Sequence, residues 1–292
     1  MRQARPSSPA FGRVDVSGIG DTHLIMAKPL KIVSWNINSV RLRAPNVASF
    51  VAAEAPDVIC LQETKCQDGE FPEKQFREMG LRHLILNGQK GGHHGVAIAS
   101  RLPLERADVP DLCRHGHARA IAARVNGLEI HNIYLPAGGD EPDPVKNDKF
   151  AHKLDFLEKL GRGYKTLPRA PRLLVGDLNV APHENDVWSH KQLLKIVSHT
   201  PVETGLLEDS RQTAAFADIA RLAVPDEQKL YSWWSYRARD WAASNKGRRL
   251  DHIWANPDAL PDTKVDTYRV HLAWRGGWKP SDHAPISVKV SV

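Results

Sequence analysis

The stretch Lys279-Pro280-Ser281-Asp282-His283-Ala284-Pro285 lies near the end of the 292-residue chain and sets an acid beside an imidazole. A turn-favouring Pro-Ser pair precedes them, and an apolar alternation from Ile286 to Val292 follows. The pattern predicts a short loop that delivers Asp282 and His283 to the start of a final strand. Adjacent residues on a strand point to opposite faces, but at a loop–strand junction both can reach one cleft. An isolated Asp-His pair is usually an ordinary surface loop, so its meaning depends on what the other strands bring to it.

The composition, with 41% hydrophobic and 25% charged residues, is ordinary for a soluble globular protein. The length permits one large α/β domain or two small ones. No apolar run approaches the roughly 18 residues that span a bilayer, so the sequence predicts no transmembrane segment. The cysteines Cys60, Cys66 and Cys113 lack metal-ligand spacing. They fit reduced thiols in a cytoplasm.

The net charge of +6 is compatible with a polyanionic partner. Cations and aromatic rings alternate in one segment: Trp233, Trp234, Tyr236, Arg237, Arg239, Trp241, Lys246, Arg248 and Arg249. Cations beside flat aromatic surfaces suit phosphates and unstacked bases. A solvated basic loop with a few buried tryptophans is the alternative, and the segment alone does not decide between them.

Residues 1–28 have no apolar periodicity and no long apolar core, which excludes a secretory signal. Asp15 and Asp21 argue against a transit peptide. We expect a disordered tail here, and Met26 could equally be the true start. No flexible linker interrupts the remainder, so residues 29–292 are expected to form a single catalytic domain.

Alternating or continuous apolar runs predict strands, and apolar residues at helical spacing predict helices. Strands are expected over 30–36, 58–61, 84–86, 96–100, 173–175, 250–254, 265–270 and after His283, with a hairpin over 120–134 about Asn126-Gly127. Helices are expected over 45–54, 186–197 and 204–222, and around the stripe Phe150, Leu154 and Leu157. The alternation occurs in two halves, up to about Gly139 and from about Arg172. It predicts two sheets packed face to face, helices outside and one shared crest of loops.

Oxygen donors gather at the predicted strand ends: Asn36, Glu63, Asp177, Asn179, Asp251 and Asp282, joined by Tyr134 and His283. An oxygen-rich set without cysteine suits a hard divalent cation, Mg²⁺ or Mn²⁺, rather than structural zinc. The pairs His93-His94 and His115-Gly116-His117 could indicate zinc, but their spacings match no standard site. We therefore expect loop histidines there.

Crowded carboxylates repel one another unless a metal or a cation is present, which favours a hydrolytic metal site with Glu63 and Asp282 as ligands and Asn36 nearby. Asp251 lies in an apolar strand, where an unpaired carboxylate would be costly. A pair with His283 would remove that cost and orient the imidazole. A buried salt bridge from Asp251 to Arg249 is the structural alternative.

Several short motifs occur in a fixed order: Ser34-Trp35-Asn36-Ile37-Asn38, Leu61-Gln62-Glu63-Thr64-Lys65, Asn132-Ile133-Tyr134, Gly176-Asp177-Leu178-Asn179, Ser232-Trp233-Trp234-Ser235-Tyr236-Arg237, Arg249-Leu250-Asp251-His252-Ile253 and Ser281-Asp282-His283-Ala284-Pro285. Each motif is weak alone, but their order is specific. Over about residues 30–292 the chain resembles the exonuclease III family of AP endonucleases, in the endonuclease/exonuclease/phosphatase superfamily.

The resemblance implies a four-layered α/β sandwich, two packed mixed β-sheets flanked by helices, and Mg²⁺-dependent phosphodiester hydrolysis with Mn²⁺ as an alternative ion. It implies roles for eight residues: Asn36, Glu63 and Asp282 at the metal; Asp177 deprotonating or orienting water; Asn179 holding water or phosphate; Tyr134 at the phosphate or leaving oxygen; and His283, oriented by Asp251, stabilising the transition state. Whether Asp177 or His283 is the general base stays open, as does the number of metal ions.

The resemblance also implies a DNA repair nuclease that cuts 5′ to abasic sites and trims 3′ ends of duplex DNA. We expect the protein to be a cytoplasmic monomer without a membrane partner. An abasic nucleotide flips into a pocket at a lower stacking cost than an intact one. The substrate-binding residues implied are Trp233, Trp234, Arg237, Asn245, Arg248 and Leu250. Arg248 and Ala137 depart from the residues common in relatives, which leaves the balance of abasic cleavage and end trimming open.

Two rival functions share parts of this pattern. A phosphatase or phosphodiesterase for a small molecule or lipid headgroup would have the same acidic core, but the Trp-Trp-Ser-Tyr-Arg segment favours DNA. A DNA-binding module without catalysis would need no crowded acids, so Glu63, Asp177 and His283 disfavour it.

Overall fold

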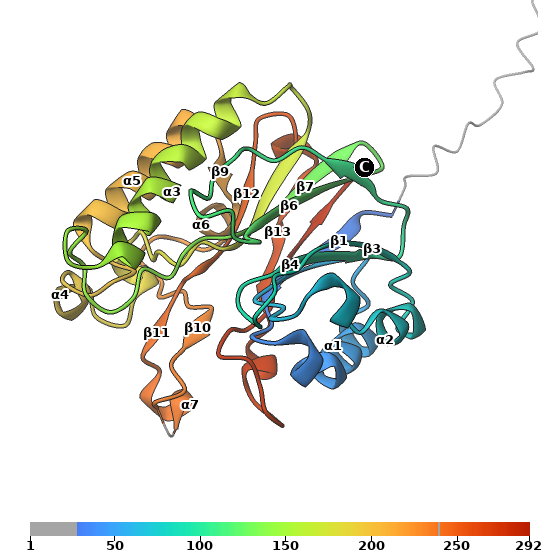
Figure 1. The fold of residues 1–292 in the computed structure, drawn as a ribbon, viewed down its shortest axis with the longest axis horizontal. Helices are drawn as coiled ribbons and strands as arrows, with labels where there is room; N and C mark the ends of the chain where they lie inside the picture. Colours follow the sequence, from blue (N-terminus) through green and yellow to red (C-terminus); the bar gives the residue numbers. More distant parts are fainter. Residues whose placement is uncertain (1–27, 239) are drawn as a thin grey trace, which may run out of the picture.

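Two six-stranded mixed sheets pack against each other in the computed structural model, which describes residues 28–238 and 240–292, and helices cover their outer faces (Figure 1). This architecture confirms the predicted four-layered α/β sandwich. The tail expected over residues 1–28 lies outside the described residues except for Lys28, and so does Arg239. In the described part of the chain, no helix combines the length and the apolar character needed to cross a membrane.

Each sheet contains strands from both halves of the chain. The first has the order β13 (Thr263–Val270), β14 (Ile286–Val290), β1 (Leu30–Asn36), β2 (Val58–Gln62), β4 (Val96–Ser100) and β3 (His83–Asn87). The second has the order β5 (Glu105–Ala107), β6 (Ala120–Val125), β7 (Leu128–Tyr134), β8 (Arg172–Asp177), β12 (Asp251–Ala255) and β9 (Ala217–Asp218). Neither half of the chain therefore contains a complete sheet.

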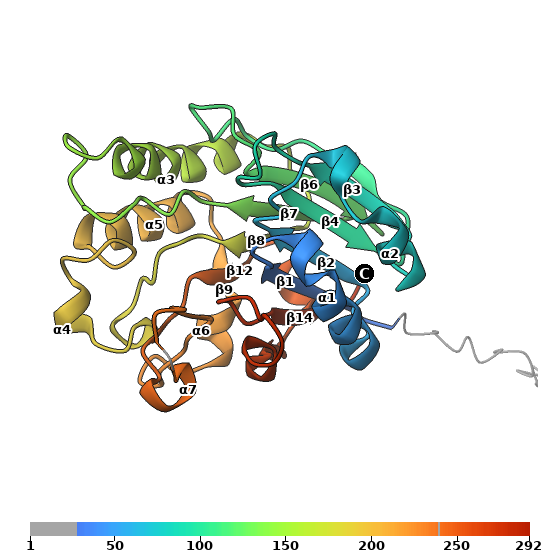
Figure 2. The ribbon, with the colours of Figure 1, turned by 60° about the horizontal axis from the view of Figure 1, so that its bottom comes forward.

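Side-chain alternation along the strands builds three apolar layers. Ile32 of β1 faces the second sheet and packs with Val175 and Ile253, whereas Val33 and Trp35 face the helices. The helices α1 (Val40–Glu54) and α2 (Glu73–Glu78) cover the first sheet, and α3 (Asp148–Thr166) and α5 (Pro201–Thr213) cover the second (Figure 2). The remaining short α-helices and strands are α4 (His190–Leu193), α6 (Ile219–Ala223), α7 (Trp241–Ser244), β10 (Trp233–Trp234) and β11 (Gly247–Arg248).

The strand directions bring the polar strand ends to one edge of the sandwich. β1 runs parallel to β2, and β7 runs parallel to β8, so each pair places its carboxyl ends together. Asn36 of the first sheet reaches Asp177 of the second with a 2.9 Å hydrogen bond. The antiparallel strand β12 begins at the same edge, with Asp251 opposite Asp177.

Two predicted helices have shifted boundaries. The helix expected over 45–54 begins earlier, at Val40, because a short helical turn precedes a kink at Arg43. Pro45, which lacks an N–H, lies at the start of the regular part after the kink. The helix expected over 204–222 is two helices, α5 and α6, separated by β9. α5 begins at Pro201 because Thr200 and Glu203 form a capping box before it.

The helix predicted over 186–197 is wrong for most of its length, because only α4 is helical there apart from one short turn that ends at Asp186. Long-range contacts hold the start of this segment extended. The Asp186 carbonyl accepts the Arg249 N–H at 2.8 Å, and Val187 bridges to Arg248. The Asp186 carboxylate accepts two hydrogen bonds from the Arg249 guanidinium, both 2.8 Å, and both residues are fully buried. Periodicity cannot reveal a partner 63 residues away along the chain.

We expect Gly176→Ala to destabilise the fold at the point that positions Asp177. Gly176 has φ +143°, and an added Cβ would lie 1.9 Å from the Ile133 carbonyl oxygen of the neighbouring strand. Relief requires strand separation, so the free energy of unfolding should fall by at least about 2 kcal/mol, measured by urea denaturation.

Gly205→Ala is the matched control, since Gly205 lies inside α5 with no heavy atom within 4 Å of an added Cβ. This change should raise the free energy of unfolding by about 0.5–1 kcal/mol. Equal effects of the two substitutions would contradict the packing argument for Gly176.

We expect Asp186→Asn to remove part of the acid sensitivity of the fold. Burial raises the pKa of Asp186, but the charges of Arg249 and Arg221 outweigh burial and lower that pKa from 3.8 to about 2. A depressed pKa contributes stability that is present above pH 3.8 and is lost as the pH falls through about 2. The stability gap between wild type and variant, on the order of 2 kcal/mol near neutral pH, should therefore shrink between pH 4 and 2. Urea denaturation at each pH measures this stability gap. A gap that does not change with pH would contradict the link between the Asp186 pKa and stability. Asp226→Asn, at an exposed carboxylate, is the control.

Candidate active site

The loop before β14 is fixed by hydrogen bonds to the first strand. Ser281 Oγ donates to the Asn36 carbonyl at 2.6 Å, and the Trp35 indole donates to the His283 carbonyl at 3.1 Å. The predicted short loop is therefore present, and it places His283 and Asp282 at the edge where the two sheets meet.

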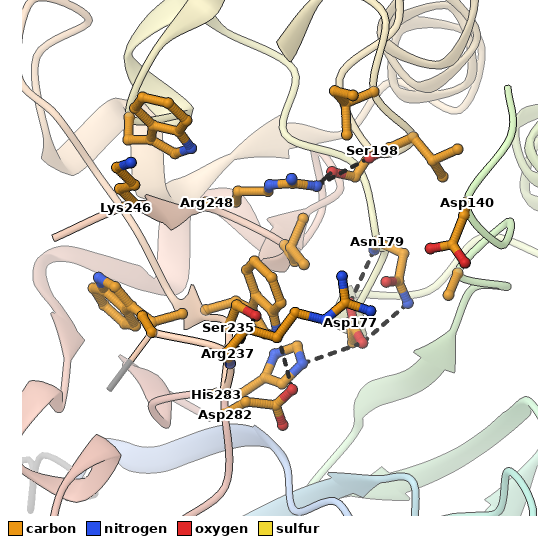
Figure 3. Close-up of a pocket in the computed structure, with 18 of the residues that line it drawn as sticks. Asp140, Asp177, Asn179, Ser198, Ser235, Arg237, Lys246, Arg248, Asp282 and His283 are labelled. Atoms are coloured by element: carbon orange, nitrogen blue, oxygen red, sulfur yellow. Dashed lines mark hydrogen bonds and ion pairs between the residues drawn. The ribbon is translucent and has the colours of Figure 1, made fainter. Parts of the chain in front are cut away.

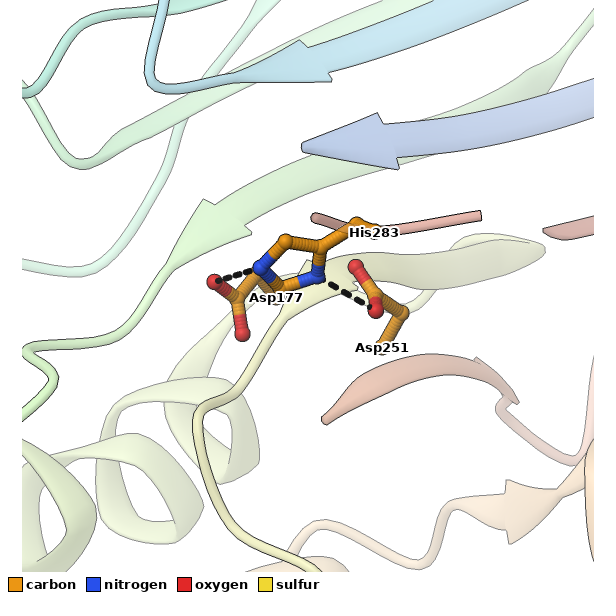
Figure 4. Close-up of side chains that lie close together, drawn as sticks. All are labelled: Asp177, Asp251 and His283. Carbon is orange, nitrogen blue, oxygen red and sulfur yellow. Dashed lines mark hydrogen bonds and ion pairs between the residues drawn. The ribbon is translucent and has the colours of Figure 1, made fainter. Parts of the chain in front are cut away.

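His283 lies between two buried carboxylates (Figure 4). Its Nδ1 is 2.8 Å from Asp251 Oδ2, and its Nε2 is 3.8 Å from Asp177 Oδ2. Ser232 Oγ also donates to Asp251 Oδ2, at 2.6 Å. The expected Asp251–His283 pair is thus present, and the alternative salt bridge to Arg249 is not, since Arg249 binds Asp186 and Asp218.

The charges of this group act on one another strongly. Burial by itself lowers the pKa of His283, but the negative charges of Asp251 and Asp177 outweigh it and raise that pKa to about 10. Burial raises the pKa of Asp177 above its ordinary value, against the opposing charge of His283. The imidazole is therefore held as a cation between its two neighbours.

Glu63 stands directly after β2 in the left-handed region, with φ 51°. Its Oε1 accepts hydrogen bonds from Asn36 Nδ2 at 2.9 Å and from the Tyr134 hydroxyl at 3.0 Å. Its Oε2 lies 2.8 Å from Lys65 Nζ. Burial raises the pKa of Glu63, but the charge of Lys65 and the Asn36 hydrogen bond outweigh it, so this carboxylate is ionised.

Asp177 is oriented by the turn that follows it. Asn179 donates to it twice, from the backbone N–H at 2.9 Å and from Nδ2 at 3.0 Å. The Asn179 carbonyl in turn accepts a 2.8 Å hydrogen bond from Lys153 Nζ, and Lys153 forms a fully buried ion pair with Glu203 at 2.5 Å. The turn is therefore anchored on α3 and α5 behind the second sheet.

The one group of described residues with three metal-ligating atoms within 4.8 Å of one another consists of Asp177, Asp251 and His283. Both nitrogens of this imidazole already face carboxylates, and a positively charged imidazole cannot bind a metal ion. This group is better described as an ion-pair chain than as a metal centre.

Glu63 and Asp282 offer a more suitable donor set at the same cavity. Asp282 is held by Asn38 Nδ2 at 3.0 Å and by the Trp233 indole at 2.9 Å. Both acids supply oxygen, as a hard cation requires. The pKa values of Glu63 and Asp282 are both lowered, so the two carboxylates are ionised, and only Glu63 has a lysine, Lys65, within ion-pair distance.

A cavity of about 850 Å³ opens above these acids, with Glu63, Asp177, Asn179, Asp282 and His283 in its lining. Arg237, Lys246 and Arg248 project from its wall, while Asp177 and His283 form its floor (Figure 3). The wall is built by the β10–β11 hairpin, in which Trp233 pairs with Arg248.

Arg248 is fixed across this wall. It donates to the Val197 carbonyl at 3.0 Å and to Ser198 Oγ at 2.7 Å, and its guanidinium carbon lies 5.3 Å from the Trp233 ring. Trp233 and Leu250 line the cavity beside it, so they form an apolar recess next to the acids.

The structure does not bring every predicted residue to the cavity. Asn245 is outside the lining, because its Oδ1 accepts the Trp234 indole hydrogen at 3.1 Å. Trp234 reaches the lining but is only 3% exposed. Asn36 and Asp251 are not in the lining and orient residues that are, whereas Tyr134 lines an adjoining cavity and donates its hydroxyl hydrogen to Glu63.

Sequence reasoning missed the supports of the site, above all Lys153. A signal exists, since Lys153 lies three residues after Phe150 and four before Leu157, on the apolar stripe of α3. A lysine at such a position needs a buried acid, and Glu203 supplies it. Ser232 and Lys65 stand within the quoted motifs but without a role assigned to them.

Comparison with known proteins agrees with this geometry. The model of the Endonuclease/Exonuclease/phosphatase family matches residues 33–283. The Haemophilus influenzae protein named exodeoxyribonuclease III is 30% identical over 273 residues, which cover 88% of this chain and 98% of that protein. An AP endonuclease structure from Archaeoglobus fulgidus superimposes with a TM-score of 0.82 at 31% identity, covering 90% of this chain and all of the other. The 3′ phosphatase NExo from Neisseria, bound to a product DNA hairpin, has a TM-score of 0.81 at 30% identity, with the same coverage.

Proposed function

This chain belongs to the Endonuclease/Exonuclease/phosphatase family and is a phosphodiester hydrolase, and we propose that it is a Mg²⁺-dependent DNA repair nuclease. Its substrates would be the phosphodiester 5′ to an abasic site and the 3′ ends of duplex DNA. The observation that carries the proposal is the meeting of Glu63, Asp177 and His283 on the floor of one cavity with a cationic, aromatic wall.

Glu63 and Asp282 would hold the divalent ion, Mg²⁺ or Mn²⁺, with Asn36 orienting Glu63 through its amide hydrogens. A bound ion of this kind supplies charge neutralisation at the phosphate and at the leaving oxygen. The ionised carboxylates of Glu63 and Asp282, which face one cavity, favour such an ion.

Asp177 would take the proton of the attacking water or orient it, since its carboxylate is buried and held by Asn179 and Asn36. His283 would stabilise the negative charge that builds on the phosphate, because two carboxylates keep the imidazole protonated. A protonated imidazole cannot accept a proton, so this arrangement favours Asp177 as the base. Tyr134 would contact the leaving oxygen or hold Glu63 in place.

The wall of the cavity would bind the DNA. Arg237, Arg248 and Lys246 carry charges suited to phosphates, and Trp233 with Leu250 would receive a flipped abasic sugar. Arg248 is tied to Ser198, so it would also limit the width of this recess. A recess too small for a base would favour a nucleotide without its base over an intact one.

We further propose that the chain works as a monomer in the cytoplasm. Cys60, Cys66 and Cys113 are all free, and the first two are buried, as expected in a reducing compartment. A small-molecule or lipid phosphatase of the same family is the rival function, and the cationic wall disfavours it.

We expect a duplex with one abasic site to be nicked 5′ to that site in Mg²⁺ and to remain intact in excess chelator. End-labelled products resolved on a denaturing gel separate internal nicking from end trimming. The same duplex with an intact base at the site is the control and should be shortened only from its 3′ ends. Hydrolysis of phosphoinositides without attack on either duplex would contradict the proposal.

We expect Asp177→Asn and His283→Gln each to lower kcat for abasic cleavage by at least about 10²-fold, because a positioned proton acceptor or charge contributes about 10²–10⁴-fold. Binding of the duplex, measured by fluorescence anisotropy, should change only a few-fold, since neither side chain belongs to the cationic wall.

His190→Gln is the matched control, because His190 lies outside the cavity lining. Its kcat should equal that of wild type. Undiminished turnover in either Asp177→Asn or His283→Gln would rule out the role given to that residue.

A further inference from the structure

A second cavity, of about 670 Å³, adjoins the candidate active site, and Ala137 and Gly139 line both. Tyr134 stands between the two, since its hydroxyl donates to Glu63 at 3.0 Å while its ring centroid lies 6.2 Å from that of His94, in the lining of the second cavity. The other ionisable side chains of this lining come from three segments: His94 before β4; His115, His117 and Arg119 before β6; and Asp148, Lys149 and His152 on α3. None of these takes part in the hydrolysis proposed above.

Arg119 is a buried cation without a counter-ion. Its side chain is in a residue only 5% exposed, and among the described residues no carboxylate forms an ion pair with it, whereas the equally buried Arg172 and Arg249 each pair with one. Its guanidinium donates one hydrogen bond, from Nη1 to the Tyr134 carbonyl at 3.3 Å, and Nε is buried without a partner in the described part of the chain. The Tyr134 ring, 4.7 Å from the guanidinium carbon, offsets only part of the cost of burying this charge.

A second nitrogen of the lining residues is also unsatisfied. Within the described residues, His117 Nδ1 is buried without a hydrogen-bond partner. The ring is held in place by stacking on His94, with the two ring centroids 4.5 Å apart. A buried nitrogen without a partner is costly, and a ligand with oxygen acceptors would remove that cost for both His117 Nδ1 and Arg119 Nε.

The charge balance of the second cavity is positive. Asp148 is the one carboxylate among its described lining residues, and Arg114 already pairs with it at 2.5 Å. Lys149, exposed on α3, adds a cation to that of Arg119, and no described carboxylate forms an ion pair with it. This lining therefore attracts an anion and repels a cation.

The histidines respond to this positive potential. Burial, followed by the positive charge of Arg119, lowers the pKa of His94 to about 3 and that of His152 to about 4. The same two causes lower the pKa of His117. These imidazoles are therefore neutral near pH 7, and each can still donate one N–H to an anion.

The position of the second cavity indicates which anion this is. Successive phosphates of one strand advance about 3.4 Å along a duplex, so a strand whose phosphate lies at Glu63 and His283 carries further phosphates along the same edge of the protein. Ala137 and Gly139, the two residues that both linings share, are small and leave room for the strand to pass over them. Guanidinium and imidazole N–H groups are suitable donors to phosphate oxygens.

We propose that the second cavity binds one phosphate group of the DNA strand, beside the phosphate that is cut. This inference rests on the proposed nuclease function and adds a second anion site to it. Arg119 supplies the fixed charge, and His117 and Lys149 donate to the phosphate oxygens. A free phosphate ion offers the same oxygens, so the experiment must distinguish these two sources.

The test measures, by fluorescence anisotropy in excess chelator, how tightly the full-length protein binds a duplex with one abasic site. Each duplex of a set carries one uncharged methylphosphonate linkage, at a different position of the strand that is cut. For wild type, one linkage other than the scissile one should weaken binding by at least about tenfold, the loss expected for hydrogen bonds to a charged group. In His117→Gln and in Lys149→Gln the same linkage should change the affinity less than about twofold, because residues in contact give non-additive effects.

Lys165→Gln is the matched control, because Lys165 is an exposed lysine of the same helix outside both cavities, and it should keep the wild-type dependence on the linkage. Lys149 is exposed as well, so misfolding cannot explain its result. Since the measurement needs no cleavage, a protein that fails to cut abasic duplexes would refute the proposed function and still give a result here.

A linkage effect that persists in both His117→Gln and Lys149→Gln would overturn the proposal, as would a set of duplexes in which only the scissile linkage matters. Titration of the DNA-free protein with inorganic phosphate tests the other source. Binding of inorganic phosphate that His117→Gln abolishes, without any effect of the linkages, would assign the cavity to the free ion and overturn its assignment to the strand.

Discussion

The burial of two carboxylates against one imidazole is the constraint on which the structure depends. Asp177 is 1% exposed, Asp251 is fully buried and His283 is 4% exposed. A buried charge without its partner costs several kcal/mol, so each of the three needs the others in place. His283 comes from the loop before β14 of the first sheet, whereas the two acids come from β8 and β12 of the second. The same ion-pair chain therefore joins the two sheets and forms the floor of the candidate active site.

The turns next to the Asp251–His283–Asp177 ion-pair chain have backbone conformations that would not form without contacts to the rest of the protein. Glu63 and Asn179 both have φ near 50°, in the left-handed region that costs a non-glycine residue about 1–2 kcal/mol. Long-range contacts hold each turn. The Lys65 N–H bonds the His94 carbonyl beside Glu63, and Lys153 bonds the Asn179 carbonyl. The strain is thus supported by residues that never touch the cavity of the active site.

The sequence predicted those parts of the structure that local patterns determine. The strand from Leu30 to Asn36 alternates, and the hairpin about Asn126-Gly127 follows from its turn, so both were found with their bounds. The pairing of Asp251 with His283 followed from the cost of an acid in an apolar strand. The extended start of the 186–197 segment depends on Arg249, far along the chain, and the exchange of strands between sheets leaves no local trace. The role of Asn245 could not be foreseen, because its partner Trp234 is set by the fold of one hairpin.

Tyr134 separates two chemically different regions of one edge. Its hydroxyl donates to Glu63 at 3.0 Å, on the side where carboxylate oxygens gather, whereas its ring lies 6.2 Å from the ring of His94 and beneath Arg119. A hard cation gains most from the first side, where the carboxylates exceed their cationic partners, and it would be repelled by Arg119 on the second. The two regions meet along the segment from Tyr134 to Gly139, so the residue whose hydroxyl orients Glu63 also lines the neighbouring cavity.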